Sequence, residues 1–229
     1  MVALIFSLLI YPQLGSPLES TLSADGHDRL GFGIYHYGRL SFYPSTEPTV
    51  MRVSIYPLLV AGSLLFGKSL YPYPLIILQA LLHALITLLT YRIVKELSGT
   101  SRHALLAGFI VAADPFLLRY IGRVVVEPLT ISLFTLLALR LLRYNDKPNF
   151  QQGLLLGIVL GIAALAKGIF LVFVIALPIL PALTGRQERK MNGETSNTSM
   201  KRGFASSKTL LLVPLRSLCL ILPWTLRNS

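Results

Sequence analysis

The stretch SLYPYPLIILQALLHALITLLTY, residues 69–91, contains 23 residues without one acidic, Lys or Arg side chain. A helix needs about 20 predominantly apolar residues to cross the hydrocarbon core of a bilayer. The stretch therefore predicts a transmembrane helix. Of the 229 residues in the chain, 53% are hydrophobic and only 14% are charged, whereas about a quarter are charged in an average soluble domain. This composition excludes an ordinary soluble enzyme and a disordered tail.

Further apolar blocks predict further spans, at 104–118 with Asp114-Pro115 inside it, at 124–142 and at 210–226. Residues 153–184 contain one charge, Lys167. At 1.5 Å per residue this block would make a helix of about 48 Å, too long for one simple crossing. We expect two short crossings that turn near Lys167-Gly168, with one long tilted helix as the alternative. The predicted fold is all-α, a polytopic transmembrane bundle of about six or seven crossings in a single domain over 1–229.

The net charge of +11 comes from 21 Lys and Arg against 10 Asp and Glu. Three polar segments, 92–103, 140–151 and 185–208, hold 12 of those 21 basic residues. Because cytoplasmic loops of membrane proteins are rich in Lys and Arg, we expect these segments on the cytoplasmic side. The basic residues lie between apolar blocks and not on one amphipathic face, which argues against nucleic acid as a partner.

This topology places a long first loop, 16–70, on the outer side of the membrane. Residues 56–66 are apolar but too short to cross, which indicates an interfacial or re-entrant helix within that loop. Tyr71 and Tyr73 fit an aromatic belt at the membrane surface. The lone Cys219 cannot form an internal disulfide, and no Cys/His cluster indicates zinc.

Charged side chains gather on the predicted outer side. Six of the ten acids lie there, together with six cations: Glu19, Asp25, Asp28, Glu47, Asp114 and Glu127, and Arg29, Arg39, Arg52, Arg119, Arg123 and Lys167. A carboxylate can take a proton from an acceptor hydroxyl or amine, and cations can hold the phosphate of a lipid-linked donor. The alternative is that these are loop charges, paired with one another or with lipid headgroups.

Several of these residues also have a purely structural interpretation. Asp25 is placed to cap a helix over 26–37, and Glu127 to favour the positive end of a helix. Asp114 fits the cap of a broken helix, and Lys167 fits a side chain that extends to the interface. His83 inside a span is typical of a helix–helix hydrogen bond.

Residues 25–43, DGHDRLGFGIYHYGRLSFY, resemble the first outer loop of GT-C superfamily glycosyltransferases that use polyprenyl-phosphate donors. The resemblance is to the family 39 type, similar to protein O-mannosyltransferases and bacterial lipid A aminoarabinose transferase. Other matching segments follow in the family's order: RVSIYP at 52–57, LFG at 65–67, PFLL at 115–118, VEPL at 126–129, the Gly-rich block at 153–167 and LPWTLRN at 222–228.

The resemblance implies an integral membrane glycosyltransferase in the plasma membrane of a prokaryote. Its sugar would pass from a polyprenyl-phosphate carrier to a lipid, glycan or protein acceptor on the outer face. The resemblance makes Asp25 the catalytic base. Asp28, Arg52, Glu127 and Lys167 become the expected substrate-binding residues, Arg52 and Lys167 for the donor phosphate and Glu127 for the acceptor.

The chain also departs from the family pattern. Family members are usually longer, the first apolar block at 1–10 is too short to cross, and Arg29 stands where an aromatic residue is usual. We therefore expect a partial protein, such as an N-terminal half. A non-enzymatic transporter or lipid-flipping component and an inactive truncated fragment remain alternatives. No cofactor is assigned. A requirement for a divalent cation remains an open alternative, because carboxylates are present but are not spaced as a set of metal ligands.

Overall fold

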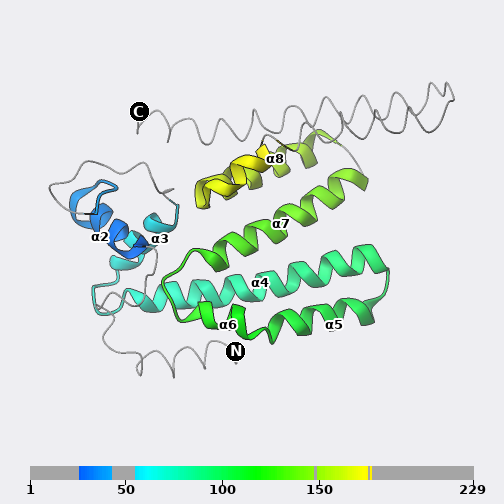
Figure 1. Cartoon of the computed structure of the whole chain (residues 1–229), viewed down its shortest axis with the longest axis horizontal. Coiled ribbons are helices and arrows are strands. Elements are labelled where there is room, and N and C mark those ends of the chain that lie inside the picture. Colours follow the sequence, from blue (N-terminus) through cyan, green and yellow to red (C-terminus); the bar gives the residue numbers. More distant parts are fainter. Residues whose placement is uncertain (1–25, 43–54, 147–148, 175, 177–229) are drawn as a thin grey trace. The chain divides into compact units, whose positions relative to one another are not determined.

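The protein is represented by a computed structural model that describes residues 26–42, 55–146, 149–174 and 176 (Figure 1). Every regular element in these ranges is helical, which confirms the all-α class. The chain divides into two compact units, Met1–Leu136 and Leu137–Ser229. The predicted span at 210–226, the basic loop at 185–208 and the apolar block at 1–10 lie outside the described residues.

The predicted span at 69–91 is confirmed as helix α4, Pro72–Ser98, which is long and apolar enough to cross a membrane. The helix begins with a proline, which is tolerated in the first turn because the N–H groups there have no helical carbonyl to bind. It closes at Gly99, whose left-handed backbone (φ 68°) directs its N–H to the Lys95 carbonyl. Buried residues recur three or four positions apart along one stripe of the helix: Pro72, Leu75, Ile76, Gln79, His83, Ile86 and Leu89.

Helix α5, Ser101–Ala112, folds back against α4 and is followed by α6, Pro115–Ile121 (Figure 1). The two helices are bent by 51° at the break between them. The Asp114 side chain accepts hydrogen bonds from the backbone N–H groups of Phe116 (2.8 Å) and Leu117 (3.4 Å). The interpretation of Asp114 as the cap of a broken helix is confirmed. The bent pair fits either a broken span or a re-entrant loop, so a crossing at 104–118 stays a prediction.

The break leaves the Ala112 carbonyl without its helical partner. Pro115 has no N–H, and Asp114 binds the N–H of Phe116. Nε2 of His83 lies 3.2 Å from this carbonyl oxygen and donates to it, since a carbonyl can only accept. The prediction that His83 makes a helix–helix hydrogen bond is confirmed.

Within the described residues, two short helices precede α4, as expected for the first loop: α2, His27–Tyr37, and α3, Ile55–Leu64. They pack together through Gly31, where a Cβ would overlap the Val60 side chain. The N-cap of α2 is Gly26 in a left-handed conformation (φ 69°). Asp25 therefore precedes the cap position and does not occupy it.

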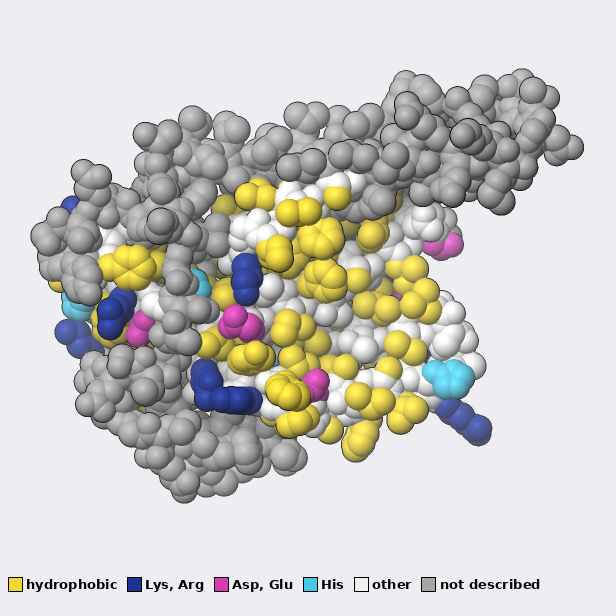
Figure 2. Space-filling model, in the orientation of Figure 1, with side chains coloured by type: hydrophobic (Ala, Val, Ile, Leu, Met, Phe, Trp, Pro, Cys, Tyr) yellow, Lys and Arg dark blue, Asp and Glu magenta, His cyan; other side chains and the backbone are white. Residues whose placement is uncertain are grey.

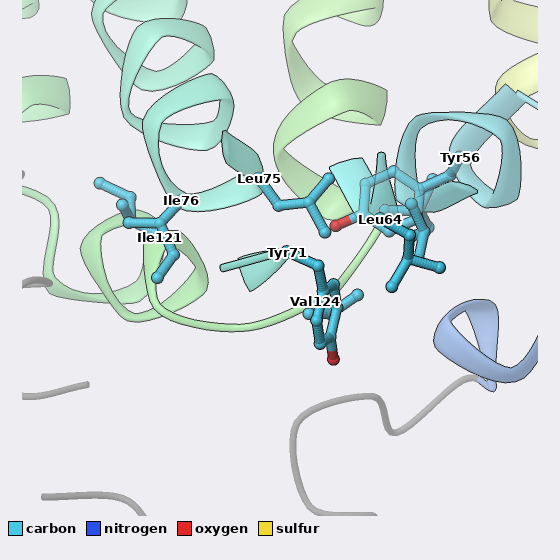
Figure 3. Packing of buried hydrophobic residues seen from close by; sticks show 9 residues of the cluster. Tyr56, Leu64, Tyr71, Leu75, Ile76, Ile121 and Val124 are labelled. Carbon is cyan, nitrogen blue, oxygen red and sulfur yellow. The ribbon is translucent and has the colours of Figure 1, made fainter. Parts of the chain in front are cut away.

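One buried apolar cluster joins α3, the start of α4, α6 and the residues after α6. Tyr56 and Leu64 of α3 pack with Tyr71, Leu75 and Ile76, and with Ile121, Val124 and Val126. In Figure 3, Ile76 lies beside Ile121 and Tyr71 beside Val124. Tyr71 is only 1% exposed, so its assignment to an interfacial belt is wrong, whereas Tyr73 is 36% exposed. We call the region of the first unit around this buried cluster the Pro72 end.

Helix α7, Glu127–Asp146, begins three residues later than the span expected at 124–142. Residues 122–126 are not helical, although Val124, Val125 and Val126 are all buried. We call residues 122–126 the connecting segment, because they join α6 to the first residue of α7.

The second unit contains the end of α7, helix α8, Phe150–Ala166, and the short helix η2, Gly168–Phe170. Asn149 caps α8 by accepting from the N–H of Gln152 (2.8 Å). The backbone becomes extended at Lys167, which confirms the predicted break near Lys167-Gly168. A second crossing after this break would involve residues outside the described ranges.

The described residues contain one helix that could cross a membrane alone, α4, or two spans if the bent pair α5–α6 counts as one. Helices α3 and α8 are apolar but shorter. Six or seven crossings therefore remain a prediction.

Large apolar side chains are exposed along α4 and α5. Leu81, Leu105, Leu106, Phe109 and Ile110 are each about 60–70% exposed, and hydrophobic side chains cover much of the visible face of these helices in Figure 2. A soluble monomer rarely exposes so continuous an apolar surface, whereas a bilayer accommodates it. The α4–α5 hairpin thus has the surface of a membrane-embedded element.

Candidate functional site

The five residues expected in the site fall into three groups. Asp28 and Glu127 lie in the first unit, and Lys167 lies in the second. Asp25 and Arg52 lie outside the described residues, although Asp25 directly precedes Gly26, the N-cap of α2.

Asp28 lies in the first turn of α2, where the positive end of the helix favours a carboxylate. Its Oδ1 accepts from the N–H of Arg29 (2.8 Å). Burial raises the pKa of Tyr71 to about 12, and the charge of Asp28 adds to that increase. Phe32 on the same helix packs edge-on against Tyr71, with ring centroids 5.5 Å apart. Asp28 is thus held close to the Tyr71 phenol.

Glu127 is the first residue of α7, which confirms its predicted place at the positive end of a helix. The residue is half-buried, and its Oε2 atom is fully buried. Burial raises the pKa of Tyr56 well above its ordinary value, and the charge of Glu127 raises it further. The Glu127 carboxylate therefore acts electrostatically on the Tyr56 phenol.

Both acids consequently border the same cluster at the Pro72 end, because Tyr56 and Tyr71 both belong to it. Arg119, in the last turn of α6, and Arg123, in the connecting segment, are exposed in the same unit. Carboxylates beside buried phenols and an apolar wall can accept protons and hydrogen bonds from a hydroxyl-bearing ligand. No group of three or more His, Cys, Asp or Glu within the described ranges could hold a metal ion.

Asp114 does not join this site. Asp114 lies two residues after Ala112, whose carbonyl accepts from the His83 side chain. At 1.5 Å per residue, His83 lies about 17 Å along α4 from Pro72. Asp114 Oδ1 is also occupied in capping α6. The break thus lies beside the middle of α4 and away from the Pro72 end, and the place of Asp114 on the outer side of the membrane stays a prediction.

Lys167 marks the end of α8. Its N–H donates to the Ala163 carbonyl (2.9 Å), and its own carbonyl accepts from Phe170 (3.1 Å). A cation at the negative end of a helix is favourable, so this position has a structural explanation of its own. A role for Lys167 in binding donor phosphate remains a prediction.

Sequence reasoning missed Gln79. This amide is 1% exposed, and its Nε2 lies within hydrogen-bond distance of Tyr56 Oη (2.8 Å) and of the carbonyl oxygens of Arg123 (2.6 Å) and Val125 (3.3 Å). The available signal was a lone amide within an otherwise apolar span, since a polar side chain in a membrane helix normally has a specific partner.

The comparisons with known proteins agree with this fold. The family model described as dolichyl-phosphate-mannose-protein mannosyltransferase matches residues 55–196, well over half of the chain. The match runs from the start of α3 past the end of α8 and includes Gln79, Glu127 and Lys167. No curated protein and no solved structure matches the chain significantly. The chain belongs to the dolichyl-phosphate-mannose-protein mannosyltransferase family, which consists of membrane-embedded GT-C glycosyltransferases that use lipid-linked sugar donors.

Proposed function

We propose that the protein transfers a sugar from a polyprenyl-phosphate carrier to a lipid, glycan or protein acceptor at the outer face of a prokaryotic plasma membrane. The observation that supports this proposal is that Asp28 and Glu127 each act on the pKa of one tyrosine, Tyr71 and Tyr56 respectively, and both tyrosines belong to one buried cluster. The site borders a hairpin whose exposed surface is apolar. A lipid-linked donor needs such a site, because its carrier stays in the bilayer while its phosphate and sugar meet polar groups.

In the proposed reaction an acceptor oxygen attacks the anomeric carbon of the donor sugar, with inversion. The bond from that carbon to the phosphate oxygen breaks, and its electron pair leaves with the polyprenyl phosphate. The acceptor proton passes to the Asp25 carboxylate, which acts as general base. Asp25 suits this role because it stands three positions before Asp28, at the start of the helix that borders the cluster.

The remaining residues bind the two substrates. Asp28 and Glu127 accept hydrogen bonds from acceptor hydroxyls beside Tyr71 and Tyr56. Arg52 and Lys167 pair with the donor phosphate and offset the charge that grows on it as the sugar leaves.

The test is transfer by the full chain in liposomes that contain labelled polyprenyl-phosphate sugars. Asp25→Asn should lower the rate by about a hundredfold or more, the usual contribution of a general base. Glu96→Gln is the matched control, because Glu96 is an exposed acid at the other end of α4, and it should leave the rate unchanged. Undiminished transfer by Asp25→Asn would exclude Asp25 as the base, and no transfer from any donor by the unaltered chain would contradict the proposed function.

A further inference from the structure

Gln79 connects three separate parts of the first unit. Its side chain is buried within α4, and its Nε2 approaches Tyr56 Oη on α3 and the carbonyl oxygens of Arg123 and Val125 in the connecting segment. These acceptors are 23, 44 and 46 residues distant in sequence. One amide thus holds α3 and the connecting segment against α4.

The connecting segment is not helical, so its carbonyls lack the regular partners of a helix. A carbonyl in a helix accepts from the N–H four residues later, and a buried carbonyl that lacks a partner is costly in an apolar environment. Within this segment the N–H of Val125 donates to the Arg123 carbonyl at 3.0 Å. The Gln79 amide adds a donor for the Arg123 carbonyl at 2.6 Å, and the Val125 carbonyl lies 3.3 Å from the same nitrogen. Helix α4 therefore stabilises the non-helical conformation of this segment.

The connecting segment leads directly into Glu127. Val125 lies two residues before it, and the Val126 carbonyl accepts from the N–H of Thr130 (3.0 Å) in the first turn of α7. Tyr56, the third Gln79 contact, is also the phenol whose pKa the Glu127 charge raises. Gln79 therefore contacts both the segment that carries Glu127 and the side chain that Glu127 approaches.

We propose that Gln79 is a positioning residue that fixes the start of α7, and with it the Glu127 carboxylate, relative to Tyr56 for acceptor binding. The proposal rests on the proposed function in one respect, the assignment of Glu127 to the acceptor. Gln79 itself need not touch either substrate.

The first experiment measures the anchor without any need for activity. In hydrogen exchange of the full chain in lipid nanodiscs, Gln79→Leu should increase exchange of the 124–130 amides, while the α5 amides stay protected. Gln79→Asn keeps the amide on a shorter side chain, should give a smaller increase, and is available if the leucine variant does not fold. Thr87→Val is the matched control, because Thr87 lies on the same helix and its hydroxyl donates only within it, to the His83 carbonyl.

The second experiment measures the consequence for transfer. Gln79→Leu should raise the acceptor KM by about tenfold or more, since small displacements of binding groups are costly, and should leave the donor KM unchanged. Gln79→Asn should fall between Gln79→Leu and the unaltered chain, and Thr87→Val should match the unaltered chain.

The outcomes separate the two proposals. Unchanged exchange at 124–130 in Gln79→Leu overturns the anchor, whatever the activity. Altered exchange with an unchanged acceptor KM, or with equal increases in both KM values, overturns the positioning role. Absence of transfer by the unaltered chain overturns the proposed function and the positioning role with it, and hydrogen exchange still decides the anchor.

Discussion

Two buried phenols, Tyr56 and Tyr71, lie at the Pro72 end. Tyr56 and Tyr71 are each about 1% exposed, and each lies close to one carboxylate, Glu127 for Tyr56 and Asp28 for Tyr71. Burial and a neighbouring negative charge both disfavour a phenolate. The tyrosines therefore stay protonated and remain hydrogen-bond donors across the physiological pH range.

Removing the charge of Asp28 should move the Tyr71 titration in a defined direction. Asp28→Asn is expected to lower the pKa of Tyr71 from about 12 but to leave it above 10.0, because burial is the larger cause of the shift. Carbon-13 NMR of labelled tyrosine rings measures this, with Tyr71→Phe to assign the signal and Glu96→Gln as the control. An unchanged pKa in Asp28→Asn would show that Asp28 does not lie beside Tyr71.

The same tyrosine should make stability depend on pH under alkaline conditions. The folded-state pKa, about 12, lies above the ordinary value of 10.0, so the folded protein holds this proton more tightly than the unfolded chain. Its contribution to stability is complete below pH 10 and is lost as the pH rises through about 12. Unfolding curves in detergent should show a smaller loss between pH 10 and 12 for Tyr71→Phe, and an equal loss would contradict the assignment.

The individual site residues were only partly predictable. The places of Asp28 and Glu127 in the first turns of α2 and α7 were predictable, because acids favour the positive end of a helix. Their roles in a site stay predictions. Gln79 was not predictable, because an amide in an apolar helix shows that a partner exists without showing which one. Tyr71 was misassigned, because an aromatic residue at the end of a span suits a membrane surface and a tertiary core equally well.

At the scale of helices, the close contact between α2 and α3 depends on Gly31. A Cβ at this position would overlap the Val60 side chain and approach the Pro57 carbonyl at 3.1 Å. Gly31→Ala should therefore lower the free energy of unfolding by about 1–3 kcal/mol, the usual cost of overpacking. It should also increase hydrogen exchange in α2, because the helix must move away from α3.

Gly62→Ala is the matched control for this prediction. Gly62 lies in α3, and a Cβ there would meet nothing within 4 Å. This variant should be as stable as the unaltered protein or more so by about 0.4–1 kcal/mol, because alanine restricts the unfolded chain. Equal behaviour of the two variants would show that α2 does not pack through Gly31.

The helix breaks were more predictable than the helix ends. Asp114-Pro115 and Lys167-Gly168 combine a charge with a residue that interrupts helices, and both mark real breaks. The start of α7 was predicted three residues too early, because Val124, Val125 and Val126 are as apolar as a span. Carbonyls of this non-helical segment accept from Gln79, a long-range contact that no local pattern contains.

At the scale of the whole molecule, the exposed apolar side chains of α4 and α5 should face lipid. Phe109 is 71% exposed on α5, and Phe109→Arg should oppose insertion by about 2.5–3.5 kcal/mol, as for a cation near the centre of a membrane helix. Leu97→Arg is the control, because Leu97 is exposed beside Lys95 and Glu96 at the end of α4. A membrane-insertion assay should separate the two variants, and equal insertion would contradict the lipid-facing surface.

The expected orientation can be tested with single cysteines in a Cys219→Ser background. Lys68 and Arg102 are exposed near opposite ends of α4. In intact cells an impermeant maleimide should label Lys68→Cys directly, because the first loop is expected outside. It should label Arg102→Cys only after the membrane is opened. The reverse pattern would place the acids of the Pro72 end in the cytoplasm.

The hydrogen bond between His83 and Ala112 has a consequence for biosynthesis. Helix α5 has 12 residues, about 18 Å, and cannot cross a bilayer of about 30 Å unaided. Its last carbonyl also needs the His83 side chain of α4. We therefore expect α4 and α5 to leave the translocon together as one unit, so that a ribosome-bound chain with α4 deleted leaves α5 accessible to protease.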